Sequence, residues 1–275
     1  MNARAVAAWS AACLFITLAT SNPAYKAVVL AAALSALAAG AGRRNTRRVL
    51  VGVALIASFA IVLNFVSAHL GTTVLFALPA TLPGVGGAYT LEALASGAAG
   101  GLTIAAAILA AAPFSVILRS HDVMDALPSA LARTGTAIAA SLNLVPAFAT
   151  SFSEVMEAQR LRGWRPRGPR SWAAVVVPVV LTSVEGSIQL AESMEARAFG
   201  SGARTRLRPA RLSGADWLVV AAAAAAGLGF AVALAAGWVA DWGPYPTLSP
   251  PTVDLRPLLA CLLLFLPVLT WRSRA

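Results

Sequence analysis

The sequence predicts an all-α integral membrane protein with about six transmembrane helices and a charged, cytoplasmic helical module between the fourth and fifth. Apolar residues make up 59% of the 275 residues and charged residues only 12%, with a mean hydropathy of +0.76. A soluble domain needs more charge than this on its surface. Six apolar runs, separated by turn signals or basic clusters, approach or reach the length that crosses a bilayer.

The first four spans are expected in the N-terminal part of the chain. The first two runs are separated only by Ser21, Asn22 and Pro23, which is typical of a tight turn between two helices. The first run also fits a cleaved signal peptide ending near "ATSNPA", because a basic start and small exit residues are both present. A second apolar run follows at once, and this favours a retained helix. The four expected spans cover residues 3–20, 24–42, 49–67 and 94–118.

Two further spans, over 217–240 and 255–271, follow the charged region. With the N-terminus in the cytoplasm, nearly all arginines and lysines fall on the inner side, and only Lys26 and Arg256 fall outside. This is the bias that the positive-inside rule describes. The sequence therefore predicts a multi-pass protein of the cell membrane with both termini in the cytoplasm. The turn-rich loop over 80–90 is expected outside, without a chemical role.

The charged region holds twelve of the 21 basic residues and seven of the eleven acidic ones. It also contains two apolar stretches, 135–152 and 172–190, that run directly into charged segments. A proline interrupts each stretch, and charged segments enter lipid only at high cost, so we expect two long helices that end in the cytoplasm. Whether either stretch enters the bilayer is left open. A short amphipathic helix over 120–134 is expected before them. The predicted organisation is thus spans one to four in 1–118, a cytoplasmic module in 119–212, and spans five and six in 213–275.

Each of these two long helices ends in a similar phrase, "EVMEAQRLRG" and "ESMEARAFG". An arginine at a helix C-terminus is favoured by the helix dipole, so simple capping explains either phrase alone. Two similar helix ends on one side of a membrane also offer a partner a two-point contact. Counted from Glu157 and Glu195, which the repeated letters align, Arg162 lies five residues on and Arg197 two. The alignment therefore predicts that the two arginines are not equivalent.

At these residues the sequence resembles the transmembrane T component of energy-coupling factor (ECF) transporters, the CbiQ/EcfT-like family. Members carry two Ala-Arg-Gly-like motifs at the ends of two cytoplasmic coupling helices. The motifs correspond here to Leu161-Arg162-Gly163 and Ala196-Arg197-Ala198. Leu161 replaces the usual small residue and Ala198 the usual glycine, while both central arginines are kept. The stretches "DALPSALAR" and "NLVPAF", which precede the first motif, also resemble that family.

The resemblance implies a T subunit of an ECF-type ABC importer, a protein that catalyses no reaction itself. It implies three partners besides the lipid bilayer: two cytoplasmic ABC ATPase subunits, and a membrane S component that binds the transported vitamin or metal ion. The transported substrate belongs to the S component and is not indicated by this chain. The residues that the resemblance assigns to the ATPase contact are Arg162, Gly163, Ala196 and Arg197, with Glu157 and Glu195 beside them.

The residues themselves indicate no catalytic, cofactor, metal or nucleic-acid site. The segment "GAAGGLT" lacks the lysine with which a P-loop contacts a phosphate. His69 and His121 stand singly, and Cys13 and Cys261 lie in separate apolar runs, so no metal-ligand set or disulfide is indicated. The formal net charge of +10 follows from the cytoplasmic arginines, and it gives no reason to expect nucleic acid.

Two other functions stay open at the level of the residues. A permease that forms its own substrate path needs a polar pocket between the spans, which the runs of alanine and leucine hardly provide. A membrane scaffold or regulatory protein without ATPase partners would keep the basic helix ends as solvated flanks. Recovery or absence of ATPase chains on purification separates these functions from energy coupling.

Other polar and small residues predict contacts between helices. Glu185, Gln189 and Glu192 recur at spacings of four and three residues, so they share one helix face. We expect them to pair with the first long helix or with Arg119 and Arg133, in preference to forming an ion path. The glycines expected to form packing surfaces are Gly97, Gly100 and Gly101, and Gly227 and Gly229.

Overall fold

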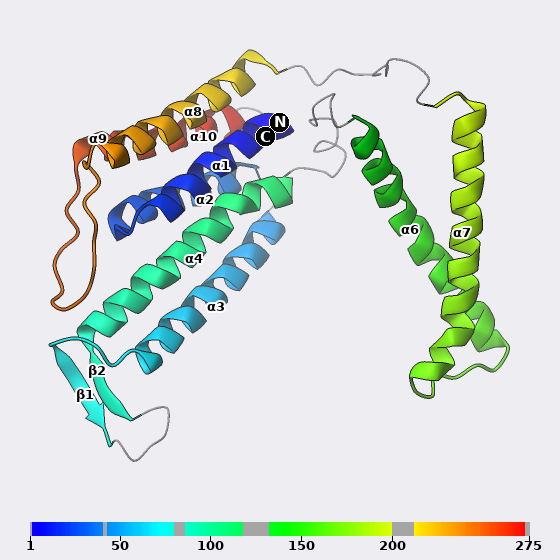
Figure 1. The fold of residues 1–275 in the computed structure, drawn as a ribbon, viewed down its shortest axis with the longest axis horizontal. Coiled ribbons are helices and arrows are strands. Elements are labelled where there is room, and N and C mark those ends of the chain that lie inside the picture. Colours follow the sequence, from blue (N-terminus) through cyan, green and yellow to red (C-terminus); the bar gives the residue numbers. More distant parts are fainter. Residues whose placement is uncertain (1, 41–42, 80–85, 118–131, 200–211, 273–275) are drawn as a thin grey trace. The chain divides into compact units, whose positions relative to one another are not determined.

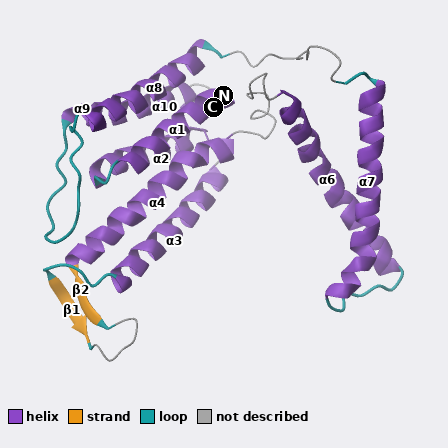
Figure 2. Cartoon of the chain, viewed as in Figure 1, coloured by secondary structure: helices purple, strands orange, loops and turns teal. Residues whose placement is uncertain are grey.

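The computed structural model describes residues 2–40, 43–79, 86–117, 132–199 and 212–272. The chain divides into two compact units. The first unit comprises Met1–Ala126 and Ala210–Ala275, and the second comprises Leu127–Pro209. Each unit is helical, with one two-stranded hairpin in the first (Figure 2). The predicted all-α architecture is confirmed.

The helices of the first unit follow the predicted spans closely (Figure 1). Within the described residues, the helices long and apolar enough to cross a membrane are α2, α3 from Thr46, α4, α8 and, in the second unit, α7. The helix α1 and the broken helix at the C-terminal end are apolar but shorter. The bounds are α1 (Ala3–Ala19), α2 (Pro23–Gly40), α3 (Arg43–Ser67), α4 (Leu91–Ile117), α8 (Gly214–Ala235), α9 (Leu255–Leu262), the 3-10 turn η3 (Leu263–Phe265) and α10 (Leu266–Arg272).

Local sequence signals fix several helix ends. Asn22 occupies the turn between α1 and α2, where its Oδ1 accepts the N–H of Ala24 at 3.0 Å and Pro23 begins α2. Pro suits this first helical position because its missing N–H would have no partner there. Ser213 and Asp216 form a reciprocal capping box at the start of α8. Asp254 accepts the N–H of Arg256 and caps α9.

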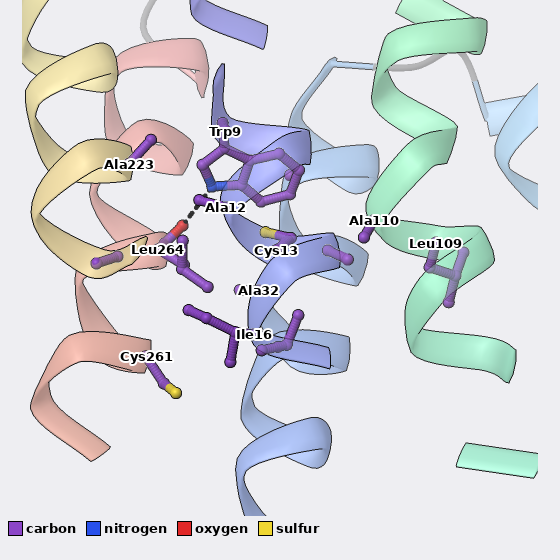
Figure 3. Packing of buried hydrophobic residues seen from close by; sticks show 14 of the residues in the cluster. Trp9, Ala12, Cys13, Ile16, Ala32, Leu109, Ala110, Ala223, Cys261 and Leu264 are labelled. Atoms are coloured by element: carbon purple, nitrogen blue, oxygen red, sulfur yellow. Dashed lines mark hydrogen bonds between the residues drawn. The ribbon is translucent and has the colours of Figure 1, made fainter. Parts of the chain in front are cut away.

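The core of the first unit is built around α1, which packs against α2, α4 and α8. Trp9 is fully buried, and its indole N–H donates to the carbonyl of Leu264 at 3.0 Å (Figure 3). That carbonyl lies in η3, where the helix is interrupted. Cys13 and Cys261 are buried free thiols in the same core. About half of the other core residues are alanines, which let the helices approach closely.

Two glycines of α4 make its contact with α3 a close one. A Cβ on Gly97 would lie 3.0 Å from the carbonyl oxygen of Ile61, and a Cβ on Gly101 would lie 2.7 Å from Ile61 Cγ1. The expected packing surface is therefore confirmed at these two positions, which lie four residues apart on one helix face. It is wrong at Gly100, which faces open space. Gly227 and Gly229 make ordinary contacts, 3.8 and 3.6 Å from alanine Cβ atoms.

A β-hairpin between α3 and α4 was not predicted from the sequence, which indicated only a turn-rich loop. Its strands β1 (Val74–Leu78) and β2 (Gly87–Thr90) pair antiparallel with an irregularity near Phe76. Residues 80–85 between them lie outside the described residues. The hairpin is tied to α4 by the buried carboxylate of Glu92, which accepts the N–H of Thr73 at 3.1 Å and its hydroxyl at 2.7 Å.

The second unit is a helical hairpin formed by α6 (Ala132–Leu161), the 3-10 turn η2 (Pro169–Trp172) and α7 (Ala173–Ala196). The two helices run antiparallel and contact each other (Figure 1). Both predicted long helices are present, and their internal prolines do not end them. The short helix expected over 120–134 falls almost wholly outside the described residues. The unit overlaps the module expected over 119–212, whose cytoplasmic position stays a prediction.

Candidate functional site

The first arginine motif forms the end of α6. The N–H of Gly163 donates to the carbonyl of Arg160 and the N–H of Trp164 donates to that of Gln159, both at 2.9 Å. Gly163 has φ +84°, a left-handed conformation that favours glycine. This pair of hydrogen bonds is the Schellman motif, and it places Arg162 at the C-cap.

The second motif ends α7 in the same way. The N–H of Ala198 donates to the carbonyl of Glu195 at 2.8 Å, and the N–H of Phe199 donates to that of Met194 at 2.9 Å. Ala198 has φ +54°, so an alanine takes the left-handed position that a glycine holds in the first motif. Such a conformation costs a residue with a Cβ about 1–2 kcal/mol. Arg197 is the C-cap of this helix.

The two arginines are therefore structurally equivalent, and the prediction that they differ is wrong. The repeated letters align Glu157 with Glu195, whereas the two caps align Glu157 with Glu192 and Arg162 with Arg197. The cap alignment superimposes the left-handed residues Gly163 and Ala198, as does the pairing of the two family motifs. It also places an aromatic residue directly after each left-handed residue. Alignment of the identical letters gave the wrong register. The hydrogen bonds that end a helix join backbone groups, so they can occur at the same position around different side chains.

An aromatic elbow, formed by Phe152, Trp164, Ser171 and Trp172, holds the first motif against the start of α7. The Trp164 indole N–H donates to the carbonyl of Ser171 at 2.9 Å. The Trp164 ring meets the Trp172 ring edge-on at 5.4 Å, and Phe152 stacks on Trp172 at 6.3 Å. Residues 163–172 are thus fixed in a closed turn, a feature that the sequence analysis did not identify.

The motif side chains point into open space within this unit. Arg162 and Arg197 are exposed, and neither makes a hydrogen bond or ion pair with another described side chain. Next to them, Leu161 is 85% exposed and Phe199 is 56% exposed. A cation flanked by an exposed apolar side chain is typical of a surface that a partner covers.

The other predicted site residues are placed as follows. Gly163 is the left-handed residue of the first cap, and Ala196 is the last residue of α7. Glu157 and Glu195 are exposed and are paired with neither motif arginine in the described part of the chain. The structure therefore brings the arginines, Gly163 and Ala196 into the two caps, and among the described residues neither carboxylate has a side-chain partner.

The two caps lie at opposite ends of the second unit. Arg162 precedes the elbow, which leads into the start of α7, and Arg197 ends the same helix (Figure 1). The 24 residues of α7 give a length of about 36 Å at 1.5 Å per residue. The unit therefore presents two equivalent basic tips, separated by a rigid helix.

The polar face of α7 does not make its expected contact with α6. Glu185, Gln189 and Glu192 are exposed, and none of their side chains bonds to a described residue. Arg119 lies outside the described residues, as does the side chain of Arg133. The two helices meet instead along apolar side chains that include Phe148 and Val184, which line a groove of about 420 Å³.

The comparison with protein families decides what kind of protein carries these tips. The family model of CbiQ, cobalt transport protein, matches residues 1–207. The chain belongs to the CbiQ family. No curated protein matches the chain. As a CbiQ-family protein it is a membrane component of a transport system and not a member of an enzyme family. The matched residues include both arginine motifs of this CbiQ chain and end before α8.

Proposed function

We propose that the chain is the transmembrane T subunit of an ECF-type ABC importer for a vitamin or a metal ion. It links two cytoplasmic ATPases to a membrane S component that binds the substrate, and it catalyses no reaction itself. The observation that carries this proposal is the pair of exposed arginines at equivalent caps on opposite ends of α7. Two equivalent tips suit two ATPase subunits.

Each tip is suited to a contact that transmits force. A guanidinium offers five donors in a fixed plane, so it binds carboxylates and carbonyl groups in a groove with a defined orientation. The Schellman hydrogen bonds fix the backbone on which each arginine stands. The exposed Leu161 and Phe199 add apolar area beside each cation. A push from the ATPase is then carried along a helix and not absorbed by a flexible loop.

The remaining site residues support the same contact. Gly163 allows the left-handed turn without strain, and Ala196 leaves room beside Arg197 for an approaching surface. Glu157 and Glu195 are exposed carboxylates available to basic residues of the partners. On this assignment the second unit is cytoplasmic and both termini of the chain face the cytoplasm.

The permease alternative lacks support in the described part of the first unit. Two cavities there, of about 560 and 530 Å³, are lined mainly by alanine, leucine and proline side chains. A path for a vitamin or a hydrated ion needs converging polar groups. The substrate site is therefore assigned to the S component.

Purification of the chain from its native membrane in mild detergent tests the proposal. Two ABC ATPase subunits and a small hydrophobic membrane protein should be recovered with it in fixed ratio, and the complex should hydrolyse ATP. Recovery of the chain without any ATPase, from cells in which it is active, would leave the scaffold function in its place.

A further inference from the structure

A groove on the first unit lies between α8 and α9, and a cation stands at one end of it. The groove encloses about 530 Å³. The helices α8 and α9 are neighbours (Figure 1). Small residues line part of the groove between them, among them Ala225, Gly229 and Ala260. Apart from Trp238 and Arg256, every lining residue is aliphatic or glycine.

The cation is held in place by an aromatic ring. The guanidinium carbon of Arg256 lies 4.2 Å from the ring centroid of Trp238, a cation–π contact that fixes its position. The nearest carboxylate in the sequence is that of Asp254. Its Oδ1 accepts the backbone N–H of Arg256 at 3.0 Å, so it caps α9 and is not bound to the guanidinium. In the part of the chain that the structure describes, no carboxylate forms an ion pair with this guanidinium.

The length of the groove along α8 corresponds to the thickness of one leaflet of a bilayer. From Ala225 to the end of α8 at Ala235, ten residues of helix extend about 15 Å. The hydrocarbon core of a bilayer is about 30 Å thick, so one leaflet is about half of that. Trp238, at the end of the groove, is the residue type that prefers the membrane interface. Arg256 then stands at the level of the lipid phosphates.

We propose that this α8–α9 groove binds one anionic glycerophospholipid, with an acyl chain along α8 and the phosphate on Arg256. A planar guanidinium donates two parallel hydrogen bonds to phosphate oxygens. Next to an indole ring and an apolar groove, this pairing is screened less than in bulk water. The proposal does not depend on the energy-coupling function.

Lipid titration of the full-length, delipidated protein in detergent tests the ligand class. Native mass spectrometry would count phosphatidylglycerol or phosphatidylcholine molecules bound to the chain. One phosphatidylglycerol per chain is expected, bound about tenfold more tightly than phosphatidylcholine, whose choline neutralises the headgroup; tenfold corresponds to about 1.4 kcal/mol. Equal binding of the two lipids would overturn the assignment to an anionic lipid.

Substitution of the arginine tests the phosphate contact. Arg256→Gln should weaken phosphatidylglycerol binding about tenfold, and Arg256→Lys should have a smaller effect because the charge remains while the planar fork is lost. The matched control is Arg48→Gln, which removes an exposed arginine from α3 and should bind lipid like the parent chain. Unchanged binding by Arg256→Gln would overturn the contact.

Filling the groove tests the acyl-chain site independently of the charge. Ala225 is exposed and lines the groove, so Ala225→Phe should block it and reduce binding. Ala224→Phe is the matched control, because Ala224 is also exposed on α8 but is absent from the lining. Neither change buries the new ring in the core, so both variants should fold. If the two variants bind phosphatidylglycerol equally well, no acyl chain occupies the groove.

Discussion

Arg162 and Arg197 occupy the same position of the same helix-ending motif, although the letters around them align differently. The helix dipole favours a cation at either position, and this alone would explain two solvated caps. An apolar residue at the position of Phe199 often accompanies a Schellman cap, but capping does not explain Leu161, which is 85% exposed beside Arg162. The combination of a fixed cation and uncovered apolar area favours a contact with another protein.

Charge reversal at the two caps is the first prediction. Arg162→Glu and Arg197→Glu should each leave unpaired charges in an ATPase contact. Breaking a buried pair costs about 3–5 kcal/mol, which weakens the contact about 150- to 5,000-fold. Both variants should still insert and accumulate in the membrane, while ATPase co-purification and substrate uptake are lost, with the double variant the most affected.

The matched control for this prediction is Arg167→Glu. Arg167 is exposed in the closed turn over 163–172, and its side chain bonds to no other described residue. Exposed pairs contribute about 0–1 kcal/mol, so uptake should be nearly normal. If Arg167→Glu abolishes uptake while both cap reversals leave it intact, the arginines of the motifs are helix caps and nothing more.

The second prediction exploits the different residues at the two left-handed positions. Ala198→Gly should stabilise the end of α7, because it removes a left-handed strain of about 1–2 kcal/mol. Gly163→Ala should destabilise the end of α6 by a similar amount, since a Cβ there meets nothing but the φ of +84° is unfavourable. Hydrogen exchange at the N–H groups of Phe199 and Trp164 should slow in the first variant and quicken in the second. The same direction of change in both variants would contradict this account.

At the scale of elements, close helix contacts and hydrogen-bonded turns join neighbouring elements. The helices α3 and α4 approach closely at Gly97 and Gly101, and the elbow joins α6 to α7 through the indole of Trp164. The first contact leaves no space for a side chain at Gly97 or Gly101. The second needs the indole N–H of Trp164 as a hydrogen-bond donor. Both element pairs are therefore expected to be sensitive to substitution at these residues.

The third prediction concerns the α3–α4 contact. Gly101→Val should destabilise the purified chain by about 1–3 kcal/mol, because the added atoms overpack against Ile61. Gly100→Val is the control at the neighbouring position, where a Cβ meets nothing within 4 Å, and helix propensity changes equally in both. Thermal unfolding in detergent should show a lower midpoint for Gly101→Val only. Because valine is a better helix former than glycine, a loss of similar size in both variants would contradict overpacking at Gly101 as its cause.

The sequence predicted the helices because long apolar runs and turn signals are local properties that survive in the fold. It placed Arg162 and Arg197 at two helix ends because two similar basic phrases followed two apolar runs, and their role in coupling stays a prediction. It failed at the β-hairpin, where strands of five and four residues carry too little periodicity to be recognised. The repeated letters alone failed at the cap register, whereas the motif resemblance, which pairs Gly163 with Ala198, gives the register of the two caps. The aromatic elbow depends on contacts between Phe152 and Trp172 that no local pattern encodes.

At the scale of the whole molecule, the energy-coupling function requires that both arginine tips face the cytoplasm and that the helices α2, α3 and α4 of the first unit span the membrane. Cysteine labelling of intact cells with an impermeant thiol reagent is the fourth prediction. Thr247→Cys, in the exposed loop after α8, should react, whereas Ser153→Cys, exposed on α6, should react only after permeabilisation. The native thiols Cys13 and Cys261 are buried and give a low background. Labelling of Ser153→Cys from outside would reverse the proposed topology.

The last prediction follows from the distance between the tips. If both arginines engage ATPases at once, their separation of about 36 Å along α7 is part of the mechanism, because a second contact adds affinity only when the geometry lets both form together. Deletion of residues 185–188, all exposed on α7, shortens the helix by about 6 Å while turning the tip by little more than one full revolution. Each motif stays intact, so a single ATPase contact should survive in pull-down experiments. Simultaneous engagement should fail, and uptake with it.

Replacement of the same four residues by alanines is the control, because it removes the side chains of Glu185 and its neighbours and keeps the length. Alanine is the strongest helix former, so α7 should remain helical. Uptake close to that of the parent chain is expected for this variant. If the alanine variant and the deletion lose uptake equally, the side chains on this face matter more than the spacing. If both retain it, the tips act independently of each other, and the rigid separation of Arg162 and Arg197 has no role in coupling.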